Sequence, residues 1–266
     1  MSLGREVDVW KPRTGVVHSA FERAVNLLVD GELWTVLGAA RADSPFGIRL
    51  AAGDAALDVK AADRVNVRAG YVGLGRLIVD CRTASRWAPA RWASPAPGLA
   101  ARLAALEHAV RARAWHESAA MAGDVTDALR GPDAALAGAV RRTVGRGPGL
   151  TPAGDDVLVG ILALLTSGAA GAAGEQAASR LAGALAPLLP TTSDLSRHLL
   201  QQAARGLAGR ALHDLGQALM LDTAHGVLSD AIELVLESGC TSGADAATGL
   251  AAAFRFMFFS PDWAAA

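Results

Sequence analysis

A glycine-rich segment and the apolar run after it predict the central feature of the structure: Gly145-Arg146-Gly147-Pro148-Gly149-Leu150-Thr151-Pro152-Ala153-Gly154-Asp155-Asp156, followed by the apolar segment 157–165. Thr151 followed by Pro152 fits a helix start, with threonine as the N-cap and proline at the first helical position. The apolar segment has no polar face, which indicates a helix surrounded by other elements. It is about half as long as the ~20 residues that a membrane span needs. We therefore expect a buried helix over 152–167.

Helical periodicity extends over the whole region after Leu99. Apolar residues recur there every three or four positions, and glycine, proline or polar residues separate the periodic runs. This pattern predicts an all-helical domain over residues 99–266. The expected helices cover residues 99–121, 124–143, 152–167, 174–188, 194–212, 224–238 and 243–258.

The first third of the chain has the pattern of β-strands. Asp30-Gly31 separates the runs 24–29 and 32–37, and this dipeptide supplies the positive φ angles of a tight hairpin turn. We therefore expect a small β-rich, barrel-like domain over residues 1–83. Further short β-rich runs are broken by glycine and cover residues 46–50, 57–60, 64–68 and 76–81.

A change of pattern separates these two regions. Residues 84–98 contain two tryptophans and three prolines and have no clear period, so they are expected to form a surface linker. The fold class is therefore α+β, with the β-rich N-terminal domain packed on the all-helical C-terminal domain. A chain of 266 residues is long enough for each part to bury a core of its own.

Composition and charge limit the partners that are expected. The formal net charge of −1 offers no basic surface for nucleic acid or for an anionic membrane, so neither is expected as a partner. Only two cysteines occur, Cys81 and Cys240, and the N-terminus has no secretory signal, which together predict a cytoplasmic protein. No lysine follows Lys60, and this argues against a kinase that uses a phosphate-binding lysine near the glycine-rich loop.

The glycine-rich loop is the first candidate site. Gly147 and Gly149 permit backbone conformations that other residues avoid, and they allow a ligand to approach the main chain. Asp155 and Asp156 follow at the first turn of a buried helix, where adjacent carboxylates are costly unless something satisfies them. Exposed amides, an arginine or a divalent metal ion such as Mg²⁺ would do so. The structural alternative is a glycine turn with aspartates that complement the helix dipole.

Two other predicted helix starts resemble this one. Ser193 directly precedes the predicted helix that contains Ser196. Ser242 and Asp245 are three positions apart, as the two residues of a capping box are. Each of these is explained by capping when it is taken alone. Three such starts in one helical domain indicate that the helix ends converge, and convergent helix N-termini form an anion site from backbone N–H groups without any lysine.

Three motifs in this region, together with weaker N-terminal ones, resemble a bacterial family of unknown function. They are G-x-G-L-T-P-x-G-D-D over 147–156, T-x-S over 191–193 with Ser196, and G-x-T-S-G-x-D over 239–245. The segments 17–21, with Asn26, and 45–48 resemble it as well. This family includes the AllH-type subunit that is associated with oxamate carbamoyltransferase in anaerobic allantoin use. The family segment Gly-His-Thr-Ser-Gly has Cys240 in the histidine position here.

The resemblance implies a carbamoyltransferase, or a subunit of one, that acts on a small anionic substrate alongside other subunits. Asp155, Asp156 and Asp245 would orient an amide nitrogen or hold a metal ion. His18 and Ser19 would contribute at the interface between the two domains. The groups expected to bind the phosphate or another anion are Gly147, Gly149, Thr151, Gly154, Ser193, Ser196, Thr241, Ser242 and Gly243.

Two other functions remain open at this stage. In the first, the chain is a non-catalytic or regulatory partner of a larger enzyme, and the glycine-rich loop is a docking element. In the second, it is a metal-dependent hydrolase in which Asp155 and Asp156 hold the ion. The residues and their spacing are compatible with all three functions.

Overall fold

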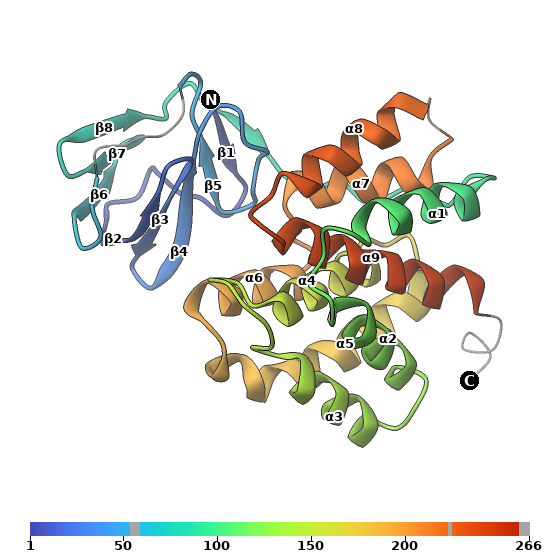
Figure 1. Ribbon diagram of the computed structural model, residues 1–266. Helices are drawn as coiled ribbons and strands as arrows, with labels where there is room; N and C mark the ends of the chain where they lie inside the picture. Colours follow the sequence, from blue (N-terminus) through green and yellow to red (C-terminus); the bar gives the residue numbers. More distant parts are fainter. Residues whose placement is uncertain (54–58, 223–224, 261–266) are drawn as a thin grey trace. The chain divides into compact units, whose positions relative to one another are not determined.

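The protein divides into two compact units, Met1–Pro89 and Ala90–Ala266, each with a hydrophobic core of its own. The structure is a computed structural model that describes residues 1–53, 59–222 and 225–260 (Figure 1). The first unit contains the described strands and the second the described helices, so the predicted α+β class is confirmed.

The first unit is a curled half-barrel made from one mixed sheet. Its strands follow the order β8-β7-β6-β2-β3-β4-β5-β1-β9 across the sheet, and neighbours are antiparallel except in the pairs β4-β5 and β1-β9. Alternate residues face a core of valine, leucine and isoleucine side chains with the buried Trp34. The strand bounds are β1 Ser2–Gly4, β2 Arg13–Phe21, β3 Ala24–Val29, β4 Glu32–Leu37, β5 Gly47–Arg49, β6 Arg64–Arg68, β7 Tyr71–Leu74, β8 Leu77–Asp80 and β9 Ser85–Trp87.

The predicted hairpin at Asp30-Gly31 is confirmed. β3 and β4 pair in antiparallel register, and both turn residues have positive φ, 47° at Asp30 and 84° at Gly31. Consecutive positive φ angles are what the twist of a two-residue hairpin requires. The strand expected over 57–60 is wrong for residues 59 and 60, which are not in a strand. Residues 57 and 58 lie outside the described residues.

The segment 84–98 does more than connect the two units. Its residues 85–87 form β9, which pairs in parallel with β1 at one edge of the sheet. Farther along, Trp92 is buried in the core of the helical unit, where its ring stacks on Phe254 with centroids 6.2 Å apart. Tryptophan side chains bury a large apolar area, so this segment is anchored rather than loosely attached.

The second unit contains nine described α-helices and one short 3₁₀ helix. The expected helices over 152–167, 174–188, 224–238 and 243–258 correspond to α4, α5, α8 and α9, with shifted bounds; residue 224 lies outside the described residues. The bounds are α1 Leu99–Val110, α2 Ser118–Ala128, α3 Asp133–Thr143, α4 Ala153–Leu165, α5 Gly171–Leu185, η1 Ala186–Thr191, α6 Asp194–Ala204, α7 Arg210–Met220, α8 His225–Leu236 and α9 Ser242–Phe259.

The single helix expected over 99–121 is wrong. The chain leaves the helix after Val110 and resumes it at Ser118. Within the break, the backbone N–H of Trp115 donates to the carboxylate of Asp245 at 2.7 Å. A helix would direct that N–H to a carbonyl four residues earlier, so this long-range hydrogen bond replaces one of the helix.

The helix expected over 124–143 is also wrong, because α2 ends at Ala128 and α3 begins at Asp133. Pro132 lies at the N-cap of α3 with φ −68° and ψ 158°. Proline has no N–H to donate and disfavours helical geometry at the residue before it, here Gly131. The two helices therefore separate at Gly131-Pro132.

The helix expected over 194–212 is wrong as well, because the chain forms two helices there, α6 and α7. Gly206 has φ 79° just after Ala204, the last residue of α6. The N–H of Leu207 then donates to the carbonyl of Gln202 at 2.9 Å, which is the Schellman pattern of a helix end. Glycine adopts this left-handed conformation at no steric cost, so the chain turns here.

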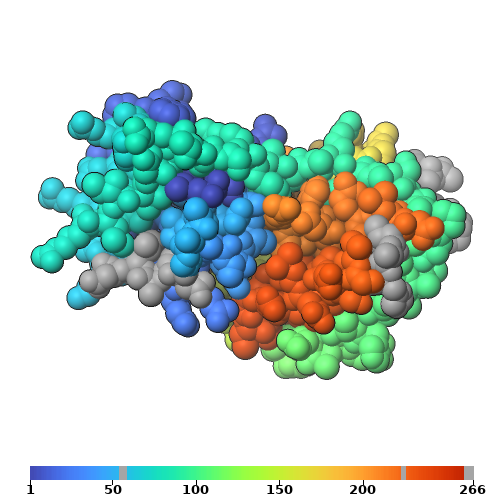
Figure 2. Space-filling model, turned by 90° about the horizontal axis from the view of Figure 1, so that it is seen from above, coloured from blue at the N-terminus to red at the C-terminus, as the bar shows by residue number. Residues whose placement is uncertain are grey.

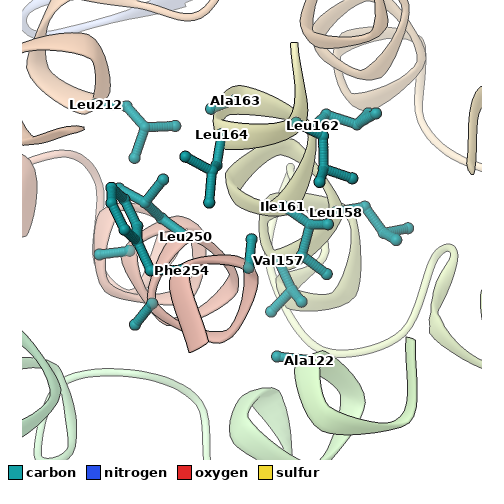
Figure 3. Close-up of a cluster of buried hydrophobic side chains, with 14 of the residues drawn as sticks. Ala122, Val157, Leu158, Ile161, Leu162, Ala163, Leu164, Leu212, Leu250 and Phe254 are labelled. Atoms are coloured by element: carbon teal, nitrogen blue, oxygen red, sulfur yellow. The ribbon is translucent and has the colours of Figure 1, made fainter. Parts of the chain in front are cut away.

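α4 lies at the centre of the helical unit, as its apolar sequence predicts. Figure 3 shows Val157 and Ile161 of α4 beside Leu250 and Phe254 of α9. α4 and α9 approach so closely because of glycine: an added Cβ at Gly160 would meet the carbonyl oxygen of Ala246 at 1.8 Å. α7 and α8, orange in Figure 2, form part of the unit's surface. In the described part of the chain, no helix is long and apolar enough to cross a membrane.

Candidate functional site

The glycine-rich loop between α3 and α4 adopts the backbone that its sequence predicts. Gly145, Gly147 and Gly149 have φ angles of 69°, 99° and 105°, in the left-handed region that favours glycine. Gly147 has a second constraint, because an added Cβ would lie 2.9 Å from the Ala153 side chain and 3.1 Å from the Trp115 ring. Alternate left-handed residues fold the loop into a compact curve at the start of α4.

Asp155 fixes one side of this loop. It lies in the first turn of α4 with 1% of its surface exposed. One carboxylate oxygen accepts the backbone N–H of Gly145 at 2.8 Å, and the other accepts the hydroxyl of Thr192 just before α6. Asp155 therefore ties the glycine loop to the beginning of α6.

Asp156 links the same loop to α9. Its Oδ2 accepts the hydroxyl of Thr151 at 3.0 Å, and Thr151 Oγ1 lies 2.9 Å from Ser242 Oγ. The Ser242 hydroxyl also hydrogen-bonds the Asp156 carboxylate, so both hydroxyls serve this acid. The chain of contacts runs from α4 through the loop to the first residue of α9.

Burial raises the pKa of the Asp156 carboxyl well above its usual value. Hydroxyls at Ser242 and Thr151 hydrogen-bond the charged form and oppose this rise. The negative charges of Asp245 and Asp155 act in the same direction as burial. The net effect favours a protonated Asp156 over a wider pH range than an exposed aspartate would have.

Asp245 is the most deeply buried acid of the cluster, with none of its surface exposed. Its Oδ1 accepts the backbone N–H of Trp115 at 2.7 Å and the hydroxyl of Ser118 at 2.6 Å. Its Oδ2 has no hydrogen-bond partner in the described part of the chain. Buried acceptors without a partner are rare in proteins, so this oxygen marks a place for a water molecule or a ligand N–H group.

The structure brings most of the predicted site residues into one region of the helical unit. Hydrogen bonds of Asp155 and Asp156 join the loop to the starts of α4, α6 and α9. Ser193 adds a further link between α6 and the loop, because its Oγ donates to the carbonyl of Leu150 at 2.9 Å. The break before α2 joins them through Asp245. The expected convergence of helix starts is therefore present in the fold.

The predicted caps have mixed outcomes. Ser193 caps α6 as expected, because its Oγ accepts the N–H of Ser196 at 3.1 Å. Thr151 is not the N-cap of α4: Pro152 occupies that position, and the threonine side chain turns to Asp156 instead. The capping box of Ser242 and Asp245 is wrong as well, since Thr241 is the N-cap of α9 and no side chain caps it.

Three residues predicted to bind an anion lie inside the packing of the unit. An added Cβ at Gly154 would meet the carbonyl oxygen of Thr143 at 2.0 Å, and one at Gly243 would meet that of Val235 at 1.8 Å. Both glycines thus have a packing reason to lack a side chain. Ser196 is buried, and its Oγ has no hydrogen-bond partner among the described residues.

The outer part of the loop has donors without acceptors. Among the described residues, nothing accepts a hydrogen bond from the backbone N–H of Gly147, Gly149 or Leu150. Gly149 and Leu150 are exposed and Gly147 is half-buried. Main-chain N–H groups in turns that contain left-handed residues form concave sites for anions. Pro148, between the two glycines, has no N–H to contribute. Arg146 lies beside them and pairs with Glu117, with Nε 3.2 Å from Oε2.

The aspartates do not form a metal site by themselves. In the described ranges, no three histidine, cysteine, aspartate or glutamate side chains lie together as they would around a metal ion. Both oxygens of Asp155 already accept hydrogen bonds from the chain. The hydrolase alternative, in which Asp155 and Asp156 hold the ion, stays a prediction.

His18 and Ser19 belong to the other unit and have a network of their own. They lie within β2 at an irregularity in its pairing with β3. Ser19 Oγ lies 3.2 Å from His18 Nδ1 and accepts from Asn26 at 3.0 Å. Thr35 then donates to Asn26 at 2.8 Å, so the polar chain crosses three strands.

Comparison with known families agrees with this division of the chain. A family model described as the oxamate carbamoyltransferase subunit AllH matches residues 143–254, and a model of the AllH family N-terminal domain matches residues 4–86. The chain belongs to the AllH family. No curated protein and no solved structure matches the sequence.

The AllH match covers the whole hydrogen-bonded loop region, from the end of α3 into α9. Cys240, which replaces the histidine of the resembling segment, is exposed and immediately precedes the N-cap of α9. An imidazole would offer a hydrogen-bonding group at that position, whereas a thiol is a weak donor.

Three residues that hold the region together were not singled out from the sequence. Trp115 and Ser118 lie in what reads as one continuous helix, and nothing local marks them as partners of Asp245. Thr192 is the neighbour of the cap residue Ser193, and only its hydrogen bond to Asp155 distinguishes it. Their partners are distant in sequence, so only the fold identifies them.

Proposed function

We propose that the chain is a subunit of an oxamate-type carbamoyltransferase and that its glycine loop binds the phosphate group of carbamoyl phosphate. The family supports the first part of this proposal. The second part rests on one observation: the main-chain N–H groups of Gly147, Gly149 and Leu150 have no acceptors in the described chain. Such groups bind oxyanions without a lysine, and the chain has none in this region.

The neighbouring side chains suit the other half of the substrate. In the transfer, the carbamoyl carbon leaves the phosphate oxygen and bonds to the amide nitrogen of oxamate, which loses a proton. Asp156 is the group that we assign to this proton, because its raised pKa brings it nearer to the pH of the reaction. Asp245 would accept an amide N–H, and Thr241 and Ser242 would donate hydrogen bonds. Asp155 is a positioning residue that keeps the loop in shape.

The anion site is tested by titrating inorganic phosphate and carbamoyl phosphate into ¹⁵N-labelled protein. We expect saturable shifts of the amide signals of Gly147, Gly149 and Leu150 at millimolar concentration. Asp155→Asn is expected to abolish these shifts, because the Gly145 N–H and the Thr192 hydroxyl donate to different oxygens and asparagine keeps only one of them. Asp124→Asn, at an exposed position on α2, is the matched control and should bind like the unmodified chain. Shifts confined to other residues, or none at all, would exclude the loop as the phosphate site.

One observation favours a second function, that of a non-catalytic subunit. Each of the three aspartates accepts hydrogen bonds from its own chain, so each has a structural task that explains its presence. In this function the cluster maintains the shape of a surface that a catalytic subunit recognises.

Reconstitution with the other subunits of the enzyme separates the two functions. Transfer of the carbamoyl group to oxamate is measured with the complete complex that contains Asp156→Asn. A catalytic role predicts a loss of turnover in an intact complex, whereas a non-catalytic role predicts unchanged turnover. Size-exclusion chromatography of the same samples shows that the complex has assembled.

A further inference from the structure

A cleft in the helical unit has no role in the function proposed above. It has a volume of about 500 Å³ and lies between α1, α2 and α9. In Figure 1, α1 and α2, in green, lie on opposite sides of the red α9, and both contact it. The residues that matter for its chemistry are Glu107, Arg111, Trp115, Asp127, Arg130 and Arg255.

Small side chains create the space in this cleft. On α2, Ala119, Ala122 and Gly123 face it, and on α9, Ala251 and Ala252 do so. On α2 these residues recur at intervals of three and four, and on α9 Ala251 and Ala252 lie three and four positions after Thr248, which also lines the cleft. Each helix therefore directs one face to the cleft. The deepest parts of the cleft are apolar, since Val110, Ala122, Ala251 and Phe256 are all buried.

Most of the charges around the cleft are already neutralised. Arg255 donates twice to Glu107, with both distances 2.7 Å. Arg130 donates to Asp127, and its guanidinium lies 5.1 Å from the centre of the Phe256 ring. Arg111 has no acidic partner within the described part of the chain, although it borders the cleft beside Trp115. One uncompensated positive charge therefore lies at the α1 end of an apolar cavity.

We propose that this cleft binds a small amphiphilic carboxylate, with an apolar or aromatic body over the alanine floor and its carboxylate on Arg111. A volume of about 500 Å³ is within the range of small-molecule sites. Guanidinium is the side-chain group best matched to a carboxylate, because it donates two parallel hydrogen bonds. With Glu107–Arg255 and Asp127–Arg130 neutralised, Arg111 is the lining arginine that is left to pair with a carboxylate.

The site is tested by calorimetry with three probes that differ in whether they carry an aromatic ring, a carboxylate or both. 3-Phenylpropionate has both the ring and the carboxylate, 3-phenyl-1-propanol has the ring alone, and propionate has the carboxylate with little apolar body. We expect 3-phenylpropionate to bind at least about tenfold more tightly than either of the others, because a charge-assisted hydrogen bond and apolar burial each contribute. Equal affinity for phenylpropanol would mean that Arg111 does not select a carboxylate, and the proposal would be wrong.

Matched variants locate the bound probe. Arg111→Gln is expected to reduce the affinity for 3-phenylpropionate to that of phenylpropanol, and Ala252→Leu, which fills the cleft, to abolish binding of both. Arg113→Gln is the control, since Arg113 is exposed two positions away and does not line the cleft. Thermal unfolding of each variant shows that the fold is intact.

Competition with inorganic phosphate distinguishes this cleft from the glycine loop. Trp115 borders the cleft, and its ring is also near Gly147 of the loop, so the two sites are neighbours. Phosphate is expected to leave the binding of 3-phenylpropionate unchanged. Displacement by phosphate, or loss of binding in Asp155→Asn with Arg111 intact, would assign the carboxylate to the loop and overturn the proposal.

Discussion

The carboxylate of Asp245, at the start of the last helix, accepts the backbone N–H of Trp115 at 2.7 Å across 130 positions of sequence. The same oxygen accepts the hydroxyl of Ser118 at 2.6 Å. This contact ends the first helical region early and places the start of α2 against α9. It also positions the Trp115 ring near Gly147, so one buried acid organises the break, the glycine loop and the cleft.

Removal of this carboxylate should destabilise the fold. We expect Asp245→Ala to lower the free energy of unfolding by about 2–4 kcal/mol, because it leaves two donors without an acceptor. Asp245→Asn keeps one acceptor oxygen for Trp115 and Ser118 and should cost less. Urea unfolding followed by circular dichroism measures both. Asp124→Ala, at an exposed position, is expected to change stability by less than about 0.5 kcal/mol. Equal stability of the alanine variant and the original chain would show that the hydrogen bonds contribute nothing net.

The raised pKa of Asp156 predicts a particular pH dependence. The folded chain holds this proton more tightly than the unfolded chain, where the pKa is near 3.8. The contribution of the group to stability is therefore fully present below that value and is lost as the pH rises through the folded pKa. In Asp156→Asn the side chain is uncharged at every pH, so this variant does not lose stability through ionisation at position 156.

The Asn variant should therefore gain stability relative to the original chain as the pH rises above about 4, until the difference reaches a plateau. Urea unfolding of both proteins across this pH range measures the difference. Asp124→Asn serves as the control, because its carboxylate is exposed. A difference that stays constant with pH would mean that the pKa of Asp156 is the same in the folded and unfolded chains.

The sequence predicts this fold well where local patterns decide the structure. The Asp30-Gly31 turn, the helical region and the buried α4 helix all follow from periodicity and turn chemistry. Two helix breaks were missed although local residues, Pro132 and Gly206, decide them, and a third was missed because the deciding contact is distant. At Trp115, a strong helical pattern is interrupted because the backbone N–H donates to Asp245 of α9. No residue near position 115 in the sequence indicates this contact.

The candidate site was also only partly predictable. Hydroxyl and carboxylate residues at three helix starts indicated convergence, and the fold brings those starts together. The sequence could not show which partner each group would choose. Thr151 and Ser242 have the residue types of caps, but both hydroxyls join the chain of contacts to Asp156, because a buried carboxylate needs hydrogen-bond donors.

The two cysteines should react very differently with iodoacetamide. Cys240 is exposed, whereas Cys81 is buried in the β unit, and burial there raises the pKa of its thiol to about 11. Only the thiolate is nucleophilic, and at pH 8 roughly one Cys81 in a thousand is ionised. Mass spectrometry of the folded protein should show one rapid modification, at Cys240, and a second only after unfolding in urea. Rapid modification of Cys81 in the folded protein would contradict its burial.

The close approach of α4 and α9 gives the most direct test of the packing. Gly160→Ala places a Cβ against the Ala246 carbonyl, 1.8 Å away, and backbone cannot move aside as a flexible side chain would. We expect a loss of about 1–3 kcal/mol in the free energy of unfolding. Gly183→Ala in α5 is the matched control, because its added Cβ meets nothing within 4 Å. There the helix gains from the better propensity of alanine, and stability should rise by about 0.5–1 kcal/mol. If both substitutions stabilise the protein, the two helices do not pack backbone to backbone at Gly160.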